Sequence, residues 1–260
     1  MRNDISDLLD FIGRDDVWRD RLQNVVAEHL MPALEEFEVH DDELSELLGE
    51  PWPGVLWGCG FEDFLGRRYG DENIVDLYLK RRGWKDAAAN RNYFAALHDA
   101  PTSLYEITEV KPGTSMVLQD LLSAAEPVTV LEKSATRSLK KWGRIAVRIV
   151  PKGDHHVISG ALLPFSAGAF ELLSEGLRGA LNLKKRDALR LAKDQLRGCA
   201  PVFTGAWLFA ELPRVMFPSQ PTFCNSDGDG VLFHDLRFPL ATGVTQKEIA
   251  ACLDGVKSFN

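Results

Sequence analysis

The stretch "SLYEITEVKPGTSMVLQDLL", residues 103–122, decides the fold, because here the apolar residues change from helical to alternating spacing. Two β-like runs flank Pro112 and Gly113. Proline presets φ for a turn and glycine accepts a positive φ, so the stretch predicts two strands joined by a tight turn.

Three further β-like runs follow this hairpin. "PVTVLEKS", residues 127–134, is one, and "GRIAVRIVPKGDHHVISGALL", residues 143–163, supplies two more, joined at residues 152–154. The first half of the second stretch alternates strictly, with apolar residues on one side and two arginines and an alanine on the other: Ile145, Val147 and Ile149 against Arg144, Ala146 and Arg148. Five short strands in about sixty residues predict a small antiparallel barrel of SH3-like kind, with the arginines on its outer face.

Apolar residues recur at helical spacing in the sequence both before and after this predicted barrel. Before it, apolar residues such as Trp18, Leu22 and Val25 recur at helical intervals within charged surroundings. After it, residues 167–181 and then "KKRDALRLAKDQLRG", residues 184–198, continue the helical pattern, followed by a predicted strand and closing helix. We therefore predict an α+β protein with an acidic helical region (1–101), a small β-barrel (102–166), and a helical region with a terminal strand and helix (167–260).

Several segments resemble a family of uncharacterised bacterial proteins that often carry a C-terminal SEC-C zinc motif. The resemblance covers roughly residues 74–166 and 222–238, and its markers are "LYE", "LQDLL", "EKSATRSL" and "NSDGDG". It implies no established activity, only an association with nucleic-acid-related or regulatory contexts. The cysteine-rich motif itself is absent from this sequence.

Charge is distributed unevenly along the chain. The formal net charge is −8, yet residues 1–50 carry −11 and residues 132–197 carry +8. Residues 132–154 alone hold seven Lys or Arg against two acids. This asymmetry predicts that the basic middle either binds a negatively charged partner or pairs with the acidic N-terminal region, within the chain or across a dimer.

Two elements contribute to the predicted basic surface. In the β region, cations interleave with a tryptophan, a combination that can follow phosphates while the ring stacks on a base. In the helix predicted next, four cations at intervals of i, i+4, i+7 and i+11 would share one face. The predicted binding residues are Lys133, Arg137, Lys140, Lys141, Trp142, Arg144, Arg148, Arg186, Arg190, Lys193 and Arg197.

Other candidate chemistry has simpler explanations. Asn225, Asp227 and Asp229 match the first half of an EF-hand loop, but the twelfth position is Leu236, so a turn explains them better. Three His-Asp pairs could bind a divalent ion in a hydrolase, although such dipeptides recur by chance: His40-Asp41, His98-Asp99 and His234-Asp235.

The cysteines and the common enzyme signatures carry little information. Four cysteines lie far apart without a CxxC pair, and Cys59, between two glycines, is interpreted as a packing residue rather than a nucleophile. The sequence contains no phosphate-binding loop, dinucleotide-binding glycine motif, nucleophile elbow or zinc-protease helix. No catalytic residue, metal ligand or cofactor is predicted. No signal peptide or membrane span is expected, and we predict a cytoplasmic protein.

These observations favour a non-enzymatic binding or regulatory module that engages a nucleic acid or an acidic protein through its basic surface. Two alternatives remain open from the sequence. One is a metal-dependent hydrolase or nuclease that uses the His-Asp pairs, and the other is a structural subunit whose charge asymmetry drives self-association through the acidic N-terminal region.

Overall fold

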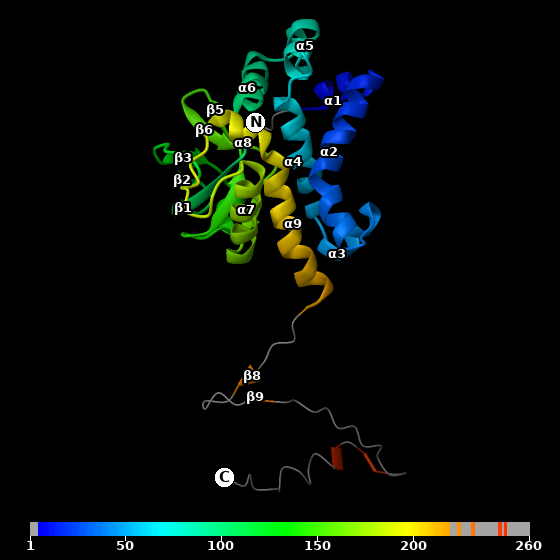
Figure 1. Cartoon of the computed structure of the whole chain (residues 1–260), viewed down its shortest axis with the longest axis vertical. Helices are drawn as coiled ribbons and strands as arrows, with labels where there is room; N and C mark the ends of the chain where they lie inside the picture. The colour runs from blue at the N-terminus through cyan, green and yellow to red at the C-terminus, as the bar shows by residue number, and fades with distance from the viewer. Residues whose placement is uncertain (1–4, 219–222, 225–229, 232–243, 246, 249–260) are drawn as a thin grey trace. The chain divides into compact units, whose positions relative to one another are not determined.

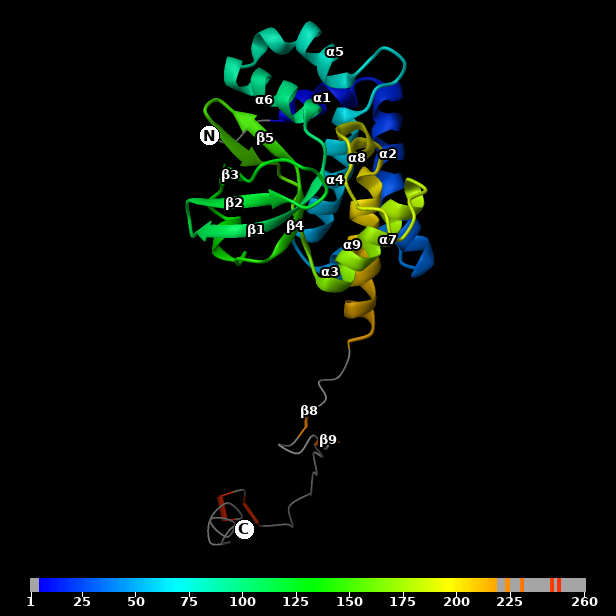
Figure 2. The same ribbon diagram turned by 60° about the vertical axis from the view of Figure 1, so that its left-hand side comes forward.

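The computed structural model describes residues 5–218, 223–224, 230–231, 244–245 and 247–248. The chain divides into two units, residues 1–218 and 219–260. In the first unit a curled sheet packs against a group of helices (Figures 1 and 2). Its helical segments, including three short 3-10 turns (η), are α1 (Ser6–Gly13), α2 (Asp16–Glu36), η1 (Asp41–Glu43), α3 (Leu44–Leu48), α4 (Trp52–Gly66), α5 (Ile74–Arg81), η2 (Gly83–Lys85), α6 (Ala88–Asp99), η3 (Ala135–Arg137), α7 (Ala167–Ala180), α8 (Lys193–Gly198) and α9 (Ala200–Met216).

The sheet of the first unit has seven strands in the order β5-β6-β3-β2-β1-β4-β7. All neighbouring strands are antiparallel except β3 and β6, which pair in parallel. The strands are β1 (Ser103–Lys111), β2 (Ser115–Asp120), β3 (Val128–Leu131), β4 (Arg144–Val147), β5 (Ile149–Lys152), β6 (His155–Ile158) and β7 (Leu163–Phe165).

The two predicted hairpins are confirmed. β1 pairs with β2 across a turn in which Gly113 has φ +71°, and β5 pairs with β6 across a turn in which Gly153 has φ +65°. Both angles lie in the left-handed region that glycine adopts without a steric penalty. The turn residues were therefore readable from the sequence.

The prediction of a five-stranded SH3-like barrel is wrong. The run predicted as one strand from residue 144 breaks at Arg148 into β4 and β5, and the stretch after β6 supplies β7. β4 pairs with β1 and β7, whereas β5 pairs with β6 at the opposite edge of the sheet. Because a single residue joins two strands that lie so far apart in the sheet order, the sheet has to curl into an open half-barrel (Figure 2).

The face of β4 that was predicted to face outward is buried instead. Ile145 and Val147 pack inside the curl with residues of β1, β2 and β3, as predicted. Ala146, on the other face, belongs to the core that the sheet shares with α2, α4, α7 and α9, and Arg148 is 3% exposed. The helices cover this face from Ala146 onward, so both faces of β4 are buried except at Arg144, which is partly exposed.

A third core fills the space between the helices at the other end of this unit. Trp18 of α2, Phe64 of α4 and Phe94 of α6 pack there with residues of α1 and α5, and Val150 of β5 closes it. This core and the one around Ala146 meet along α2 and α4, which places the buried residues of α4 beside Arg148.

The second unit is described only in part. Phe223–Cys224 (β8) pairs with Gly230–Val231 (β9) in an antiparallel pair. Thr245 Oγ1 accepts a hydrogen bond from the backbone N–H of Glu248, and the Glu248 carboxylate accepts one from the backbone N–H of Thr245, which is the reciprocal pattern of a helix N-cap. The segment Asn225, Asp227 and Asp229 that matches half of an EF-hand loop, His234-Asp235 and most of the predicted last strand and helix lie outside the described residues. No helix among the described residues is both long and apolar enough to cross a membrane.

Candidate polyanion-binding loop and a buried arginine network

The segment that joins β3 to β4, residues 132–143, carries the first group of predicted binding residues and is called the basic loop. It is held at both ends. Thr136 is buried, and its hydroxyl accepts a hydrogen bond from the N–H of Gly113 at the β1–β2 turn. Near the other end, Trp142 N–H donates to Ile107 O of β1 at 2.8 Å. The loop is therefore a fixed structure on the sheet.

Trp142 is the most unusual residue of the basic loop. Its φ is +70°, a conformation that is strained for a bulky side chain, and 64% of it is exposed. The next residue, Gly143, is tightly placed, since a Cβ atom there would lie 3.0 Å from Lys140 O. The backbone thus presents a large ring to solvent, where the ring contacts the Lys141 ammonium at 4.5 Å from its centroid.

The cations of the basic loop are not neutralised. Lys133, Arg137, Lys140 and Lys141 are all exposed. None of the four makes an ion pair with any acid in the described part of the chain, including the acidic N-terminal residues 5–50. Their positive charge is available to a partner.

Arg144, at the start of β4, belongs only partly to this surface. Its Nε lies 3.7 Å from Glu106 Oε1 on the neighbouring strand, and its guanidinium lies 4.4 Å from the centroid of the Phe170 ring. The side chain is about one-third exposed. The guanidinium of Arg144 is therefore already in contact with a carboxylate and an aromatic face, and only part of it is available to a ligand.

The second predicted group, in residues 186–197, does not share one helix face. α7 ends at Ala180, Asn182 adopts a left-handed φ of +54°, and Arg178 donates to the carbonyls of Lys184 and Asp187. These bonds fold residues 181–192 as a loop. Arg186 and Arg190 are exposed in this loop, whereas Lys193 and Arg197 lie in the short helix α8.

This group lies apart from the basic loop. Arg190 donates to Ser123 O, beyond the end of β2, whereas the basic loop is anchored to Gly113, before its beginning. A strand of this length spans about 20 Å. The two groups that the sequence predicted as one surface are anchored at opposite ends of β2.

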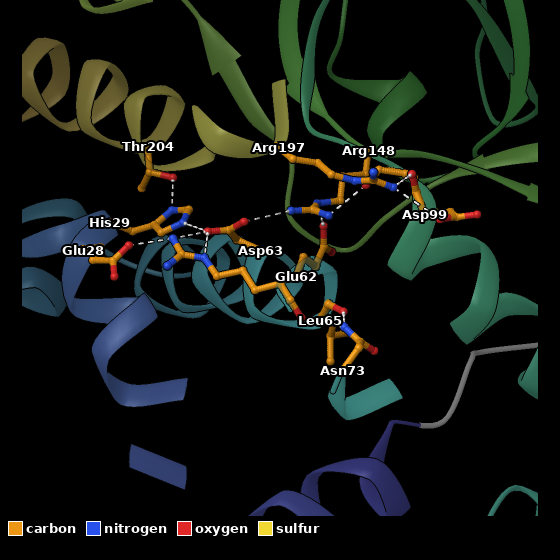
Figure 3. A network of polar contacts seen from close by, with 12 residues as sticks. Glu28, His29, Glu62, Asp63, Leu65, Asn73, Asp99, Arg148, Arg197 and Thr204 are labelled. Carbon is orange, nitrogen blue, oxygen red and sulfur yellow. Dashed lines mark hydrogen bonds and ion pairs between the residues drawn. The ribbon is translucent and has the colours of Figure 1, made fainter. Parts of the chain in front are cut away.

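Arg148 lies in a buried polar network between the sheet and the helices (Figure 3). Its Nη1 donates to Ala100 O at 2.8 Å. Its Nε lies 3.7 Å from Glu62 Oε2 and its Nη2 lies 3.9 Å from Asp63 Oδ1, both on α4. The predicted exposed binding residue is thus an internal link between β4 and α4, where it balances two buried carboxylates.

His29 of α2 extends the same network, although no pattern in the sequence singled it out. Its Nε2 lies 3.2 Å from Asp63 Oδ2 and its Nδ1 lies 2.8 Å from Thr204 Oγ1 of α9. An ionised carboxylate can only accept, so Nε2 carries the proton toward Asp63. This Thr-His-Asp chain resembles a catalytic triad in its order of contacts, but all three side chains are buried and the adjoining cavity is only ≈10 Å³. No substrate fits there, and the chain ties three helices together.

The network also shifts the pKa values of its acids. Burial raises the pKa of Glu62, and this effect is larger than the opposite effect of the positive charge of Arg148, which lowers the same pKa. The Ser159 hydroxyl beside Glu62 opposes this rise, although its Oγ does not reach a hydrogen bond of ordinary geometry. Burial would also raise the pKa of Asp63, but the hydrogen bond from His29 and the charge of Arg67 hold that pKa below its usual value.

A cleft of ≈500 Å³ opens beside this network and is called the arginine cleft. Its lining combines four arginines with two acids: Arg67, Arg68, Arg148 and Arg197 with Glu28 and Asp63. Arg67 binds Asp63 and Glu28, and Arg197 binds Asp99 and Asp194. Arg148 and Arg197, predicted from separate elements, do come together here, but acids already hold them.

The histidine and cysteine candidates that the structure describes form no catalytic arrangement. His98 and Asp99 lie 3.9 Å apart, and Asp99 binds Arg197. No cluster of three His, Cys, Asp or Glu side chains suited to a metal occurs among the residues described. Cys59 is half-buried as a residue, but its thiol lies among Glu62 and Thr204, and burial raises its pKa to about 12. A thiol with that pKa stays protonated at neutral pH, which agrees with the packing interpretation.

Fold and site together define an α+β protein with a half-barrel sheet and an exposed basic loop. Residues 65–188 match the model of a family described as a family of unknown function (DUF7986). The match supports the resemblance to uncharacterised proteins and gives no evidence for an association with the SEC-C motif. No curated protein and no solved structure matches the chain.

Proposed function

We propose that this chain is a non-enzymatic binding module whose basic loop engages a polyanion, with single-stranded nucleic acid as the ligand. One observation carries the proposal. Trp142 is held outward in a strained conformation within a fixed loop, and the same loop carries four exposed cations that have no acid partner in the described structure.

Energetics favour a binding role for this arrangement. A left-handed φ in a non-glycine residue costs on the order of 1–3 kcal/mol and persists only where the surroundings impose it, often at functional sites. Exposing most of a tryptophan leaves apolar surface in water. Neither feature stabilises the free protein, whereas a flat, negatively charged ligand that covers the ring would bury the exposed apolar surface and offset the cost of the strain.

The combination of ring and charges favours nucleic acid over an acidic protein. Lysine and arginine would attract either partner. Stacking of an exposed aromatic ring on a base contributes about 1–3 kcal/mol and needs no particular base, because every base has a π face. An acidic peptide offers the loop charge but no comparable stacking surface. The expected ligand is therefore a single strand, bound with little sequence preference.

Charge reversal with a matched control tests the proposal. Lys140→Glu with Lys141→Glu should weaken the binding of a fluorescent oligothymidylate by tenfold or more at low salt, measured by anisotropy, because phosphate contacts dominate such affinities. Lys184→Glu with Lys185→Glu makes the same charge change in the loop after α7 and should leave the affinity within about twofold. Both pairs are exposed, so the unfolding free energy should change by no more than about 0.5 kcal/mol per substitution.

Three outcomes would contradict the proposal. The first is no binding of the oligonucleotide by the unmodified chain at low salt. The second is equal weakening by the two double variants, which would mean that only net charge matters. The third is retention of an acidic polypeptide such as polyglutamate, in place of the oligonucleotide, with loss in the Lys140/Lys141 variant, which would assign the loop to a protein partner.

A further inference from the structure

A second cleft, of ≈900 Å³, lies on the side of α4 that faces β6 and is called the Trp57 cleft. Its walls come from α4, α6, the end of β3, the first residues of the basic loop and the β5–β6 hairpin, and the segment 159–162 follows along it. A volume of this size lies within the range of small-molecule sites, which combine apolar and aromatic walls with a few polar groups.

Aromatic and aliphatic surface is exposed in this cleft. Trp57 stacks on Phe61 with ring centroids 5.0 Å apart and an interplanar angle of 11°. Phe61 is buried, but Trp57 is 38% exposed, and Leu131 from the sheet is 45% exposed. Large apolar side chains that are left in solvent within a concave surface commonly mark a ligand site. The Trp57 ring, fixed by its stack on Phe61, offers a flat surface to a ligand.

The charged residues of the cleft are mostly acidic. Glu50, Glu62 and Glu132 line it, against one cation, Lys152. Lys152 lies 5.8 Å from the centroid of the Tyr93 ring, so it is engaged on the α6 wall. Ala161 N–H donates to Glu62 Oε1 and fixes this carboxyl at the wall, and Arg148 balances its charge, so Glu50 and Glu132 are the acids left to attract a ligand. The cleft therefore favours a positively charged ligand over a negatively charged one.

From these features we infer that the Trp57 cleft binds a small molecule that joins a flat apolar ring to an ammonium group. The ring would lie on Trp57 and Leu131, and the ammonium would lie near Glu50 and Glu132. A cation close to a tryptophan face is attracted by the ring quadrupole, and the attraction increases as the cation is desolvated. The cleft shares Glu132, Ser134 and Ala135 with the basic loop, but Lys140, Lys141 and Trp142 do not line it, so this inference does not depend on the function proposed for the loop.

Three probes that share one ring system test the ligand class. Tryptamine carries an ammonium, indole-3-propionate carries a carboxylate, and indole itself is neutral. With the full chain, ligand-observed saturation-transfer NMR and calorimetry should show tryptamine binding most tightly, by about tenfold or more over indole-3-propionate. Equal affinity for the three would overturn the charge argument, and tighter binding of the carboxylate would reverse it.

Variants with a matched control test the location. Trp57→Ala should weaken tryptamine binding about tenfold, whereas Trp84→Ala should not change it, because Trp84 is 75% exposed and does not line this cleft. Glu132→Gln should weaken tryptamine binding and leave the affinity for indole unchanged. If Trp57→Ala unfolds the chain, Leu131→Lys replaces it, because it changes an exposed residue and adds a repelling cation to the cleft.

Two results would refute the site. One is tryptamine binding that survives both Trp57→Ala and Leu131→Lys in folded protein, since the ligand would then lie elsewhere. The other is the absence of any tryptamine signal with the unmodified chain at millimolar concentration. The Lys140/Lys141 charge reversal should leave tryptamine affinity unchanged, so failure at the basic loop and failure at this cleft are told apart.

Discussion

The basic loop and the arginine cleft are both rich in cations, but the cations of the cleft are paired with acids and those of the loop are exposed without an acid partner in the described structure. In the arginine cleft, Arg67, Arg148 and Arg197 each face carboxylates at 2.6 to 3.9 Å, and Arg148 is almost completely buried. In the basic loop, Lys140 and Lys141 are exposed with no acid partner in the described structure. The sequence shows both regions only as positive charge.

This difference separates structural from functional charge. A buried cation must be paired, because its desolvation is costly, and removing one partner leaves the other charge without compensation. An exposed lysine contributes little to stability and remains available to a ligand. Substitutions in the cleft should therefore affect folding, and substitutions in the loop should affect binding.

The largest effect is expected at Arg148. Arg148→Met removes the cation that faces Glu62 and Asp63 and should lower the unfolding free energy by about 3–5 kcal/mol in urea denaturation. Adding Glu62→Gln should recover part of the loss, because it removes one of the uncompensated buried acids. A loss below about 1 kcal/mol, or strict additivity of the two changes, would show that the network does not hold the sheet to α4.

A pH titration probes the same interior through Cys59. Its folded pKa of about 12 lies above the usual 9.0, so only the unfolded thiol ionises between these values. Since the folded state then binds more protons, stability should fall as pH rises above 9, by up to about 1.4 kcal/mol per pH unit. Cys59→Ala should lack this contribution in urea unfolding measured from pH 8 to 10.5. Parallel pH profiles for the two proteins would mean that the thiol reaches solvent.

Substitutions of Trp142 test the contribution of the aromatic ring of the basic loop to binding. Trp142→Ala should weaken oligothymidylate binding by about 1–3 kcal/mol, from loss of base stacking. Trp142→Gly should weaken it equally and leave the unfolding free energy within about 1 kcal/mol, because glycine adopts a positive φ without strain. A large loss of stability in the glycine variant would show that Trp142 is a packing residue.

The sequence predicted much of the local structure. The change of period at residue 103, the turns at Gly113 and Gly153, and the buried row of Ile145 and Val147 all follow from short-range chemistry, and the structure has them. The break of the strand at Arg148 could not be predicted from this short-range chemistry. An arginine in an alternating strand indicates an exposed face, and only the helices that cover this face turn it into a buried ion-pair partner.

Parts of the candidate site depended on long-range packing in the same way. The helix predicted over residues 184–198 has suitable spacing, but the left-handed Asn182 and the hydrogen bonds of Arg178 end α7 and fold the next residues as a loop. His29 could not be singled out, because its partners lie 34 and 175 residues away. The exposure of the four cations in the basic loop was predictable, since local composition alone indicates a polar surface segment, whereas their role in binding stays a prediction.

The salt dependence of binding tests the central claim most directly, because it counts the charges that contact phosphate. For single strands the logarithm of the affinity falls with the logarithm of salt concentration by about 0.7 for each phosphate neutralised. Lys140→Ala with Lys141→Ala should therefore reduce the slope for oligothymidylate by about 1.4, and Lys184→Ala with Lys185→Ala should leave it unchanged. An unchanged slope in the Lys140/Lys141 variant would contradict the claim that the basic loop is the binding surface.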